Sequence, residues 1–338
     1  MNFTRRSFHK HSLGLLASLG GISCLNQTVK TSASGSTTKI PVILDTDIGD
    51  DLDDTWALIM LLRSQELDLK LITTSFGNTK YRTRLLAKLL QNFGHTDIPL
   101  GLGLDPTDQP GNQSDWLLDY KLSEYPGEVH EDGVQILIDT IKASPEPVCL
   151  LCIGPVMNIA EALRREPSIA ENARFVGMHG SVYLGYDGAP KPAAEWNVKV
   201  DPNSLQKVFA APWDCSITPL DSCGLVQLKD EKYQRVYQSN DNWVKVLLDN
   251  YKIWLPNIPW YGPDHDLSKR SSTLFDTVAV YMAHSQEFLR MEDVLLRVTD
   301  DGFTVIDETN GRNVHCAVGW KNQSAFEDIL VSLISNSL

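Results

Sequence analysis

A run of six aspartates within ten residues, DTDIGDDLDD at positions 45–54, constrains this chain more than any other feature. Apolar residues 40–44 precede the run directly, and an apolar helical pattern begins at Trp56. Carboxylates packed this densely repel one another and lose hydration wherever a fold holds them together. A bound divalent cation relieves both costs, because hard cations take oxygen ligands. A solvated loop is the alternative for a charge run, but the buried-type strand and helix beside it favour a binding site at a strand's carboxyl end.

Strand and helix patterns alternate along the chain. Strands are expected at residues 39–44, 67–74, 148–153 and 174–178, and helices at residues 54–64, 82–92, 133–143 and 156–165. This rhythm predicts an α/β fold with a mostly parallel, layered open sheet and helices on both faces. Strands near 289–298 and 313–319 predict a small mixed or antiparallel C-terminal part. Because no linker composition follows residue 38, residues 39–338 are expected to form a single domain.

The N-terminal segment carries an export pattern. Residues 4–10, TRRSFHK, match the twin-arginine signal, and residues 13–22 are apolar but too few to span a membrane. Residues 1–35 are therefore predicted to be a signal peptide and linker, which predicts export to a bacterial periplasm. Cys24 offers an alternative as a lipid anchor, although Gly21 is a poor residue for that processing site.

Charge and cysteine positions narrow the function classes. The net charge of −13 argues against a nucleic-acid partner, because phosphate backbones demand a basic surface. Cys149 and Cys152 invite a redox or zinc interpretation, but residues three apart on a strand point to opposite faces, which favours core packing. Cys215 and Cys223 could pair across a loop in an oxidising compartment, and the sequence leaves that question open.

Five motifs occur in a fixed order over residues 39–320. They are DTDIG…LDD with Ala57, then Gly77-Asn78, Ile153-Gly154-Pro155 with Asn158, AEWN at 194–197 with Asp201-Pro202, and Phe275-Asp276 with Ala279. The D-x-D-x-G start alone also resembles the haloacid-dehalogenase phosphatases, but those need Thr or Val at the position of Ile48 and lack the later Asp-Asp pair. Taken together, the five motifs resemble the nucleoside hydrolase family of the inosine–uridine preferring type.

The resemblance implies a Ca²⁺ site. Its ligands would be Asp47, Asp54, Asp276 and the backbone carbonyl of Ile153. Such an oxygen-rich set suits Ca²⁺ better than Zn²⁺, which prefers His and Cys. Asp47 would also be the general base that takes a proton from the attacking water, with Asp45 supporting it from the same strand.

The acidic loop departs from the family pattern. The family's Asp-Asp pair lies two residues closer to D-x-D than Asp53-Asp54 do, so Asp50 and Asp51 are interpreted as an insertion. This register makes Asp54 the metal ligand and Asp53 a ligand of the sugar hydroxyls, because Trp56 then continues the family's helix. In the alternative register, Asp50 or Asp51 reaches the ion instead.

The remaining site residues follow from the same resemblance. Asn78, Glu195 and Asn197 are the expected ribose-binding residues, with Met178 packing against the sugar. A site that hydrogen-bonds each hydroxyl rejects substrates that lack one, because its own polar groups would stay unpaired.

Two further departures affect leaving-group activation. Phe275 stands where purine-type members carry an acidic His, and Ala189 stands where an Asn is expected. His265, on a loop with aromatic neighbours, is the candidate acid in place of that His. His130 matches a family His near the sugar, and His179 is a further candidate to face the pocket.

These features predict Ca²⁺-dependent hydrolysis of the N-glycosidic bond of ribonucleosides, giving ribose and the free base. The Phe275 and Ala189 departures leave two alternatives open, a hydrolase of another ribosyl compound and a secreted ribose- or nucleoside-binding protein without turnover. Because family members are commonly dimers or tetramers, the resemblance also implies a homo-oligomer.

Overall fold

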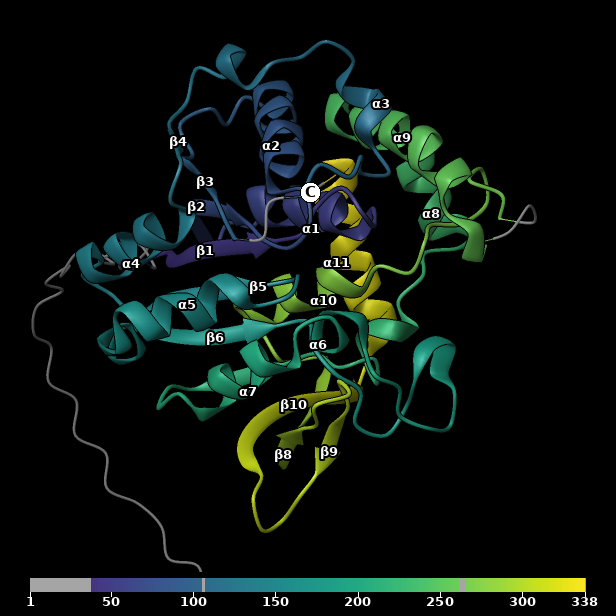
Figure 1. The fold of residues 1–338 in the computed structure, drawn as a ribbon. Coiled ribbons are helices and arrows are strands. Elements are labelled where there is room, and N and C mark those ends of the chain that lie inside the picture. Colours follow the sequence, from purple (N-terminus) through teal and green to yellow (C-terminus); the bar gives the residue numbers. More distant parts are fainter. Residues whose placement is uncertain (1–37, 105–106, 262–264, 338) are drawn as a thin grey trace, which may run out of the picture. The chain divides into compact units, whose positions relative to one another are not determined.

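Ten strands form one open sheet in the order β4-β3-β2-β1-β5-β6-β7-β10-β8-β9 (Figure 1). The structure is a computed structural model that describes residues 38–104, 107–261 and 265–337. The strands are β1 (Ile40–Thr46), β2 (Leu67–Thr74), β3 (Leu100–Leu102), β4 (Val129–His130), β5 (Val148–Cys152), β6 (Ala173–Gly177), β7 (Cys215–Ile217), β8 (Leu289–Val298), β9 (Thr304–Ile306) and β10 (Arg312–Trp320). All pairs from β4 to β10 are parallel, whereas β8 runs antiparallel to both β10 and β9.

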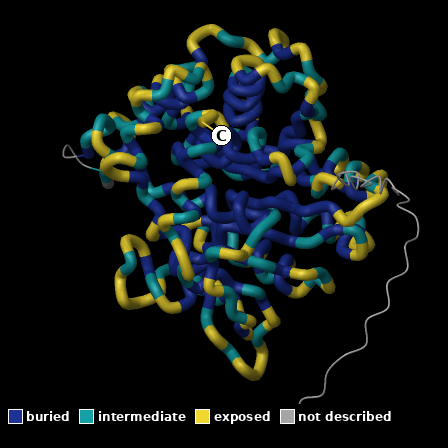
Figure 2. Tube along the Cα trace, turned by 180° about the vertical axis from the view of Figure 1, so that it is seen from behind, coloured by how far each residue is buried: buried dark blue, intermediate teal, exposed yellow. Residues whose placement is uncertain are grey.

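Helices cover both faces of the sheet. They are α1 (Asp53–Arg63), α2 (Thr79–Phe93), α3 (Ser114–Leu117), α4 (Gly133–Ala143), α5 (Met157–Arg165), α6 (Trp196–Lys199), α7 (Pro202–Ala210), α8 (Asp230–Tyr237), α9 (Asn242–Trp254), α10 (Phe275–Met282) and α11 (Gln323–Ser335). One hydrophobic core lies under α1, α2 and α8–α11, and a second lies under α4, α5 and α7. Figure 2 shows these buried residues along the centre of the chain trace, with exposed residues at its edges.

The central strands are buried because helices close both faces, as parallel sheets require. Every residue of β5 is buried, and β1 is buried from Val42 onward. Cys149 packs in the first core and Cys152 in the second, which confirms that these thiols point to opposite faces. Cys215 and Cys223 are both free thiols, so the structure contains no disulfide between them.

The predicted α/β class, with its parallel sheet and mixed C-terminal part, is confirmed. Helix α2 begins three residues earlier than the predicted helix at 82–92, because the Asn78 side chain caps it by accepting from the Tyr81 amide. The short strands β3, β4, β7 and β9 were not predicted. Two or three residues are too few to show a strand period.

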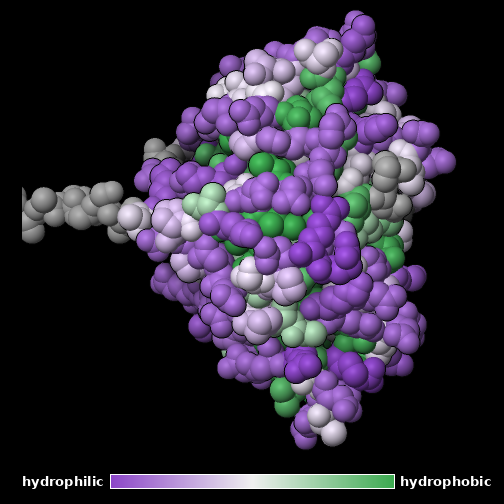
Figure 3. All heavy atoms as spheres, turned by 60° about the vertical axis from the view of Figure 1, so that its left-hand side comes forward, coloured by the Kyte–Doolittle hydropathy of each residue, from purple (hydrophilic) through white to green (hydrophobic). Residues whose placement is uncertain are grey.

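The contacts of residues 38–338 group them into one compact unit. The predicted signal peptide and linker and the candidate lipid anchor Cys24 lie outside the described residues. Across the part of the chain that is described, no helix has the length and apolar character needed to cross a membrane. In Figure 3 hydrophilic residues cover most of the visible face, and hydrophobic residues show mainly in the recesses between them.

Candidate active site

The acidic loop joins the carboxyl end of β1 to the first turn of α1. Thr46, the last residue of β1, donates its hydroxyl to Asp54 and accepts the Ile48 amide at 3.0 Å. This one side chain therefore ties the start of the loop to its end. Asp53 and Asp54 occupy the first helical turn, where the helix dipole favours negative charge.

Three carboxylates meet at this point. One oxygen each from Asp53, Asp54 and Asp276 lies within 4.8 Å of the others, and all three residues are buried. The Asp276 amide, at the start of α10, donates to Asp53 at 3.2 Å. Burial raises the pKa of each carboxyl well above its ordinary value, and the negative charges of its neighbours raise it further. The cluster therefore needs a cation or protons to be stable.

Asp47 lies beside this cluster on the same loop. Burial raises the pKa of Asp47 to about 7, the Arg82 guanidinium opposes that rise, and the charge of Asp47 in turn raises the pKa of Asp54. A Cβ on Gly154 would stand 2.6 Å from Asp47 Oδ1, so only glycine leaves room for this carboxylate. Asp45 lies two residues earlier, on β1. Its carboxylate accepts hydrogen bonds from the Asn158 side chain at 2.9 Å and the Thr73 hydroxyl at 3.0 Å.

The donor set fits a hard divalent cation. Asp47, Asp53, Asp54 and Asp276 supply carboxylate oxygens only, and no lysine or arginine forms an ion pair with them among the described residues. Oxygen ligands of this kind suit Ca²⁺, and its charge would return the carboxyls to the ionised form.

The next polar group surrounds Glu195. Its carboxylate accepts the Gly180 amide at 2.9 Å and the Asn197 amide at 2.7 Å, while burial raises its pKa to about 7. The Asn197 side chain donates to the carbonyls of Ile153 at 3.2 Å and Met178 at 3.0 Å. The structure thus brings together four residues that were predicted for the site from three separate segments. They are Ile153, Met178, and the pair Glu195 and Asn197.

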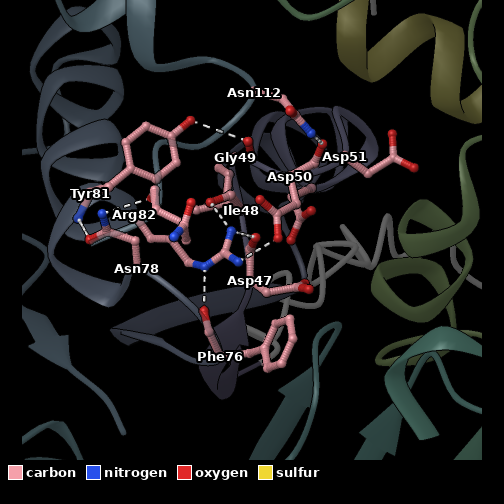
Figure 4. A network of polar contacts seen from close by, with 12 residues as sticks. Asp47, Ile48, Gly49, Asp50, Asp51, Phe76, Asn78, Tyr81, Arg82 and Asn112 are labelled. Carbon is pink, nitrogen blue, oxygen red and sulfur yellow. Dashed lines mark hydrogen bonds and ion pairs between the residues drawn. The ribbon is translucent and has the colours of Figure 1, made fainter. Parts of the chain in front are cut away.

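A buried arginine underlies the acidic loop (Figure 4). Arg82 on α2 donates to the carbonyls of Asp47, Ile48 (3.0 Å) and Phe76 (2.7 Å), and it forms an ion pair with Asp50 at 2.7 Å. Sequence reasoning missed this residue, because an arginine near a helix start is usually a surface residue.

The two inserted aspartates have different surroundings. Asp50 is turned toward Arg82, whereas Asp51 points to the other side of the loop and accepts the Leu52 amide at 2.7 Å (Figure 4). The negative charge of Asp51 raises the pKa of Asp53 and of Tyr261, which places Asp51 on the side of the carboxylate cluster.

Asn78 lies at the other edge of the Arg82 network. Its side chain caps α2 and donates to the Gln109 carbonyl at 2.9 Å. It lines a cavity of about 280 Å³ together with Phe76 and Arg82. Phe76 has a φ of 59°, an uncommon conformation for a bulky residue, and its ring meets Trp196 edge-on at 6.3 Å. Sequence reasoning did not single out this aromatic pair.

The histidines considered as acids contact other groups. His130 lies on β4 near the sheet edge, 3.4 Å from Glu128. His179 is fully buried and its Nε2 lies 3.1 Å from the Gly154 carbonyl. His265, expected on a loop with aromatic neighbours, is buried, with its Nε2 3.5 Å from the Tyr251 hydroxyl and its ring against Tyr261. No contact among the described residues links these rings to the carboxylate cluster.

The carboxylate cluster lies at the carboxyl ends of a mostly parallel sheet, and structural similarity shows that the fold is that of the nucleoside hydrolases. The plant nucleoside hydrolase PpNRh1 shares this fold, with a TM-score of 0.75 and 20% identity over 88% of this chain and 99% of that one.

The sequence comparisons give the family. The model of the inosine-uridine preferring nucleoside hydrolase family matches residues 42–328, so the chain belongs to that family and is an N-glycosyl hydrolase. It is similar to pyrimidine-specific ribonucleoside hydrolase RihA of Escherichia coli O127:H6, with 32% identity over 67% of this chain and 77% of the relative. It is also similar to probable uridine nucleosidase 1 of Oryza sativa subsp. japonica, with 27% identity over 63% of this chain and 69% of the relative.

Proposed function

We propose that the chain hydrolyses the N-glycosidic bond of ribonucleosides in a Ca²⁺-dependent reaction and releases ribose and the free base. The observation that supports this most is the buried carboxylate set of Asp47, Asp53, Asp54 and Asp276, beside the polar group around Glu195. An acidic site next to a polar, hydroxyl-binding site is what hydrolysis at the anomeric carbon of a sugar requires.

Asp47, Asp54, Asp276 and the Ile153 carbonyl would hold the ion. When bound, Ca²⁺ lowers the pKa of a water molecule that it ligates and so provides a nucleophile near neutral pH. Asp47 is proposed as the general base, because it is buried at the end of β1 with no donor side chain bonded to its carboxylate among the described contacts. A carboxylate in that place can take the proton from the attacking water.

The sugar is proposed to lie between two sets of residues. Asn197, whose amide donates to Glu195, would hold ribose hydroxyls together with Glu195, and Met178 would pack against the ring. Asp53 and Asn78 would also contact ribose hydroxyls. Holding the sugar this way positions C1′ for attack and stabilises an oxocarbenium-like transition state.

Ribonucleosides are the proposed substrates because the relatives are named as a uridine nucleosidase and a pyrimidine-specific ribonucleoside hydrolase. Phe275 and Ala189 support a second candidate, another ribosyl compound, since both replace groups expected near the leaving group. A planar, activated leaving group needs less help to depart than a purine does.

Reducing-sugar release from a panel of ribonucleosides and p-nitrophenyl riboside tests this function. We expect ribose from at least one nucleoside, loss of activity after chelation, and recovery on adding Ca²⁺. Release from p-nitrophenyl riboside alone would favour the second candidate. Release from none of them by calcium-loaded protein would contradict both.

A further inference from the structure

The departing base needs a hydrogen-bond donor, because cleavage leaves negative charge on it. Phe275 offers none, and the carboxylates of Asp53, Asp54 and Asp276 only accept hydrogen bonds when they are ionised. The candidate histidines contact a main-chain carbonyl, an exposed glutamate and a tyrosine instead. A neutral hydroxyl from another segment that reaches the site can supply the donor.

Tyr186 is such a group. It lies in the segment between β6 and α6, and its hydroxyl accepts the Trp196 amide at 2.9 Å, directly beside Glu195. Its ring meets Phe275 edge-on at 6.3 Å. Tyr186 therefore spans from the proposed sugar-binding residues to the residue before Asp276.

The hydroxyl is placed to donate. It already accepts one hydrogen bond, and no acceptor for its own proton appears among the described residues. A hydroxyl that accepts a bond becomes a better donor, because the two bonds polarise each other. Tyr186 is 39% exposed, but desolvation of its hydroxyl raises its pKa, and the negative charges of Glu195 and Asp51 add to that rise, so the hydroxyl keeps its proton.

We propose that the Tyr186 hydroxyl donates a hydrogen bond to the departing group, an assignment that rests on the proposed function. The bond from C1′ to the departing nitrogen breaks, and both electrons stay with the nitrogen. The water oxygen bonds to C1′ and its proton passes to Asp47. Tyr186 shares its proton without releasing it, and the base takes its own proton from solvent after departure.

Tyr186→Phe tests the assignment, because it removes the hydroxyl and keeps the ring against Phe275. The turnover number for inosine should fall by about 10²-fold, as for other single donors to a developing negative charge. Turnover of p-nitrophenyl riboside, whose leaving group needs little help, should change little, and KM for inosine should stay close to that of the wild type. Tyr183→Phe is the matched control, since that hydroxyl lies 3.2 Å from Glu292, away from Phe275.

The outcomes distinguish failure of the Tyr186 donor role from failure of the proposed hydrolase function. A loss confined to inosine, with an unchanged melting temperature, supports the donor role. Equal losses on both substrates, or no loss, overturn the donor role while wild-type turnover keeps the proposed function. If the wild type hydrolyses neither substrate, the proposed function fails and the donor role fails with it.

Discussion

At the scale of single residues, the neighbours Asp50 and Asp51, which are interpreted from the sequence as an insertion, have different surroundings. Asp50 forms an ion pair with Arg82, whereas Asp51 lies close enough to Tyr261 and Asp53 for its charge to raise their pKa values. Asp53 and Asp54 both lie close to Asp276, and the chosen register assigns Asp54 to the ion and Asp53 to the sugar. Their roles as ligands remain predictions.

The register of the acidic loop can be tested by calcium titration. Asp54→Ala should abolish binding, because it removes a carboxylate from the centre of the cluster. Asp50→Ala should leave most of the affinity, since that side chain is bonded to Arg82. Equal losses from the two substitutions would mean that the insertion lies elsewhere.

A pH-dependent contribution to stability is expected from His179. Burial lowers its pKa from 6.5 to about 4, so the unfolded chain takes up a proton on acidification before the folded chain does. The stabilising contribution is therefore present above pH 6.5 and is lost as the pH falls toward 4. Between pH 7.5 and 5, wild type should lose about 2 kcal/mol more unfolding free energy than His179→Asn.

Urea unfolding at several pH values measures this difference. His95→Gln, at a partly exposed histidine whose ring contacts Trp243, is the control variant. Parallel stability curves for wild type and His179→Asn would show that the His179 ring does not titrate as its burial implies.

At the scale of elements, β1, its loop and α2 form one supporting unit. Arg82 on α2 donates to the carbonyls of Asp47 and Ile48, so its hydrogen bonds attach the acidic loop to the helix. Phe76, with its positive φ, turns its own carbonyl toward the same guanidinium. Residues in strained conformations often occur at functional sites.

Replacing Arg82 should destabilise the whole chain. Arg82→Met leaves buried carbonyls without a donor, which should cost about 3 kcal/mol of unfolding free energy in calcium-free buffer. Little of this comes from the ion pair itself, because Asp50 is 42% exposed.

Arg84→Met is the matched control, since Arg84 lies on the same helix and, among the described residues, its side chain bonds only the Tyr120 carbonyl. Denaturant unfolding should show a clearly smaller loss for this variant. A loss as small for Arg82→Met would contradict the supporting role of the buried guanidinium.

Much of this unit could be predicted from the sequence. The apolar stretch before Asp45 predicted β1, and the helical pattern from Trp56 set the register of Asp53 and Asp54. Arg82 could not be predicted, because two of its partners are the main-chain carbonyls of Asp47 and Ile48, more than thirty positions away, and carbonyls carry no side-chain signal. Tyr186 was missed for a related reason, as its importance depends on tertiary contacts with Trp196 and Phe275.

At the scale of the whole molecule, the predicted export signal in residues 1–35 can be tested separately from the hydrolase domain. Changing Arg5-Arg6 to Lys-Lys should trap the protein in the cytoplasm, because twin-arginine export depends on the arginine pair. The same change at Arg164-Arg165, an adjacent pair on α5, conserves charge outside the signal and should leave export intact. Unchanged periplasmic yield of the first variant, measured by cell fractionation, would contradict twin-arginine export.

The central claim is that Asp47 accepts a proton from the attacking water at a buried acidic site. Ribose release by Asp47→Asn tests it most directly, because Asn keeps the shape and an oxygen but removes the charge and the proton acceptor. Turnover of the best nucleoside should fall by at least about 10²-fold. Substrate binding should weaken far less, and Asp50→Asn on the same loop should keep most of the turnover. Near wild-type ribose release by Asp47→Asn would contradict the account.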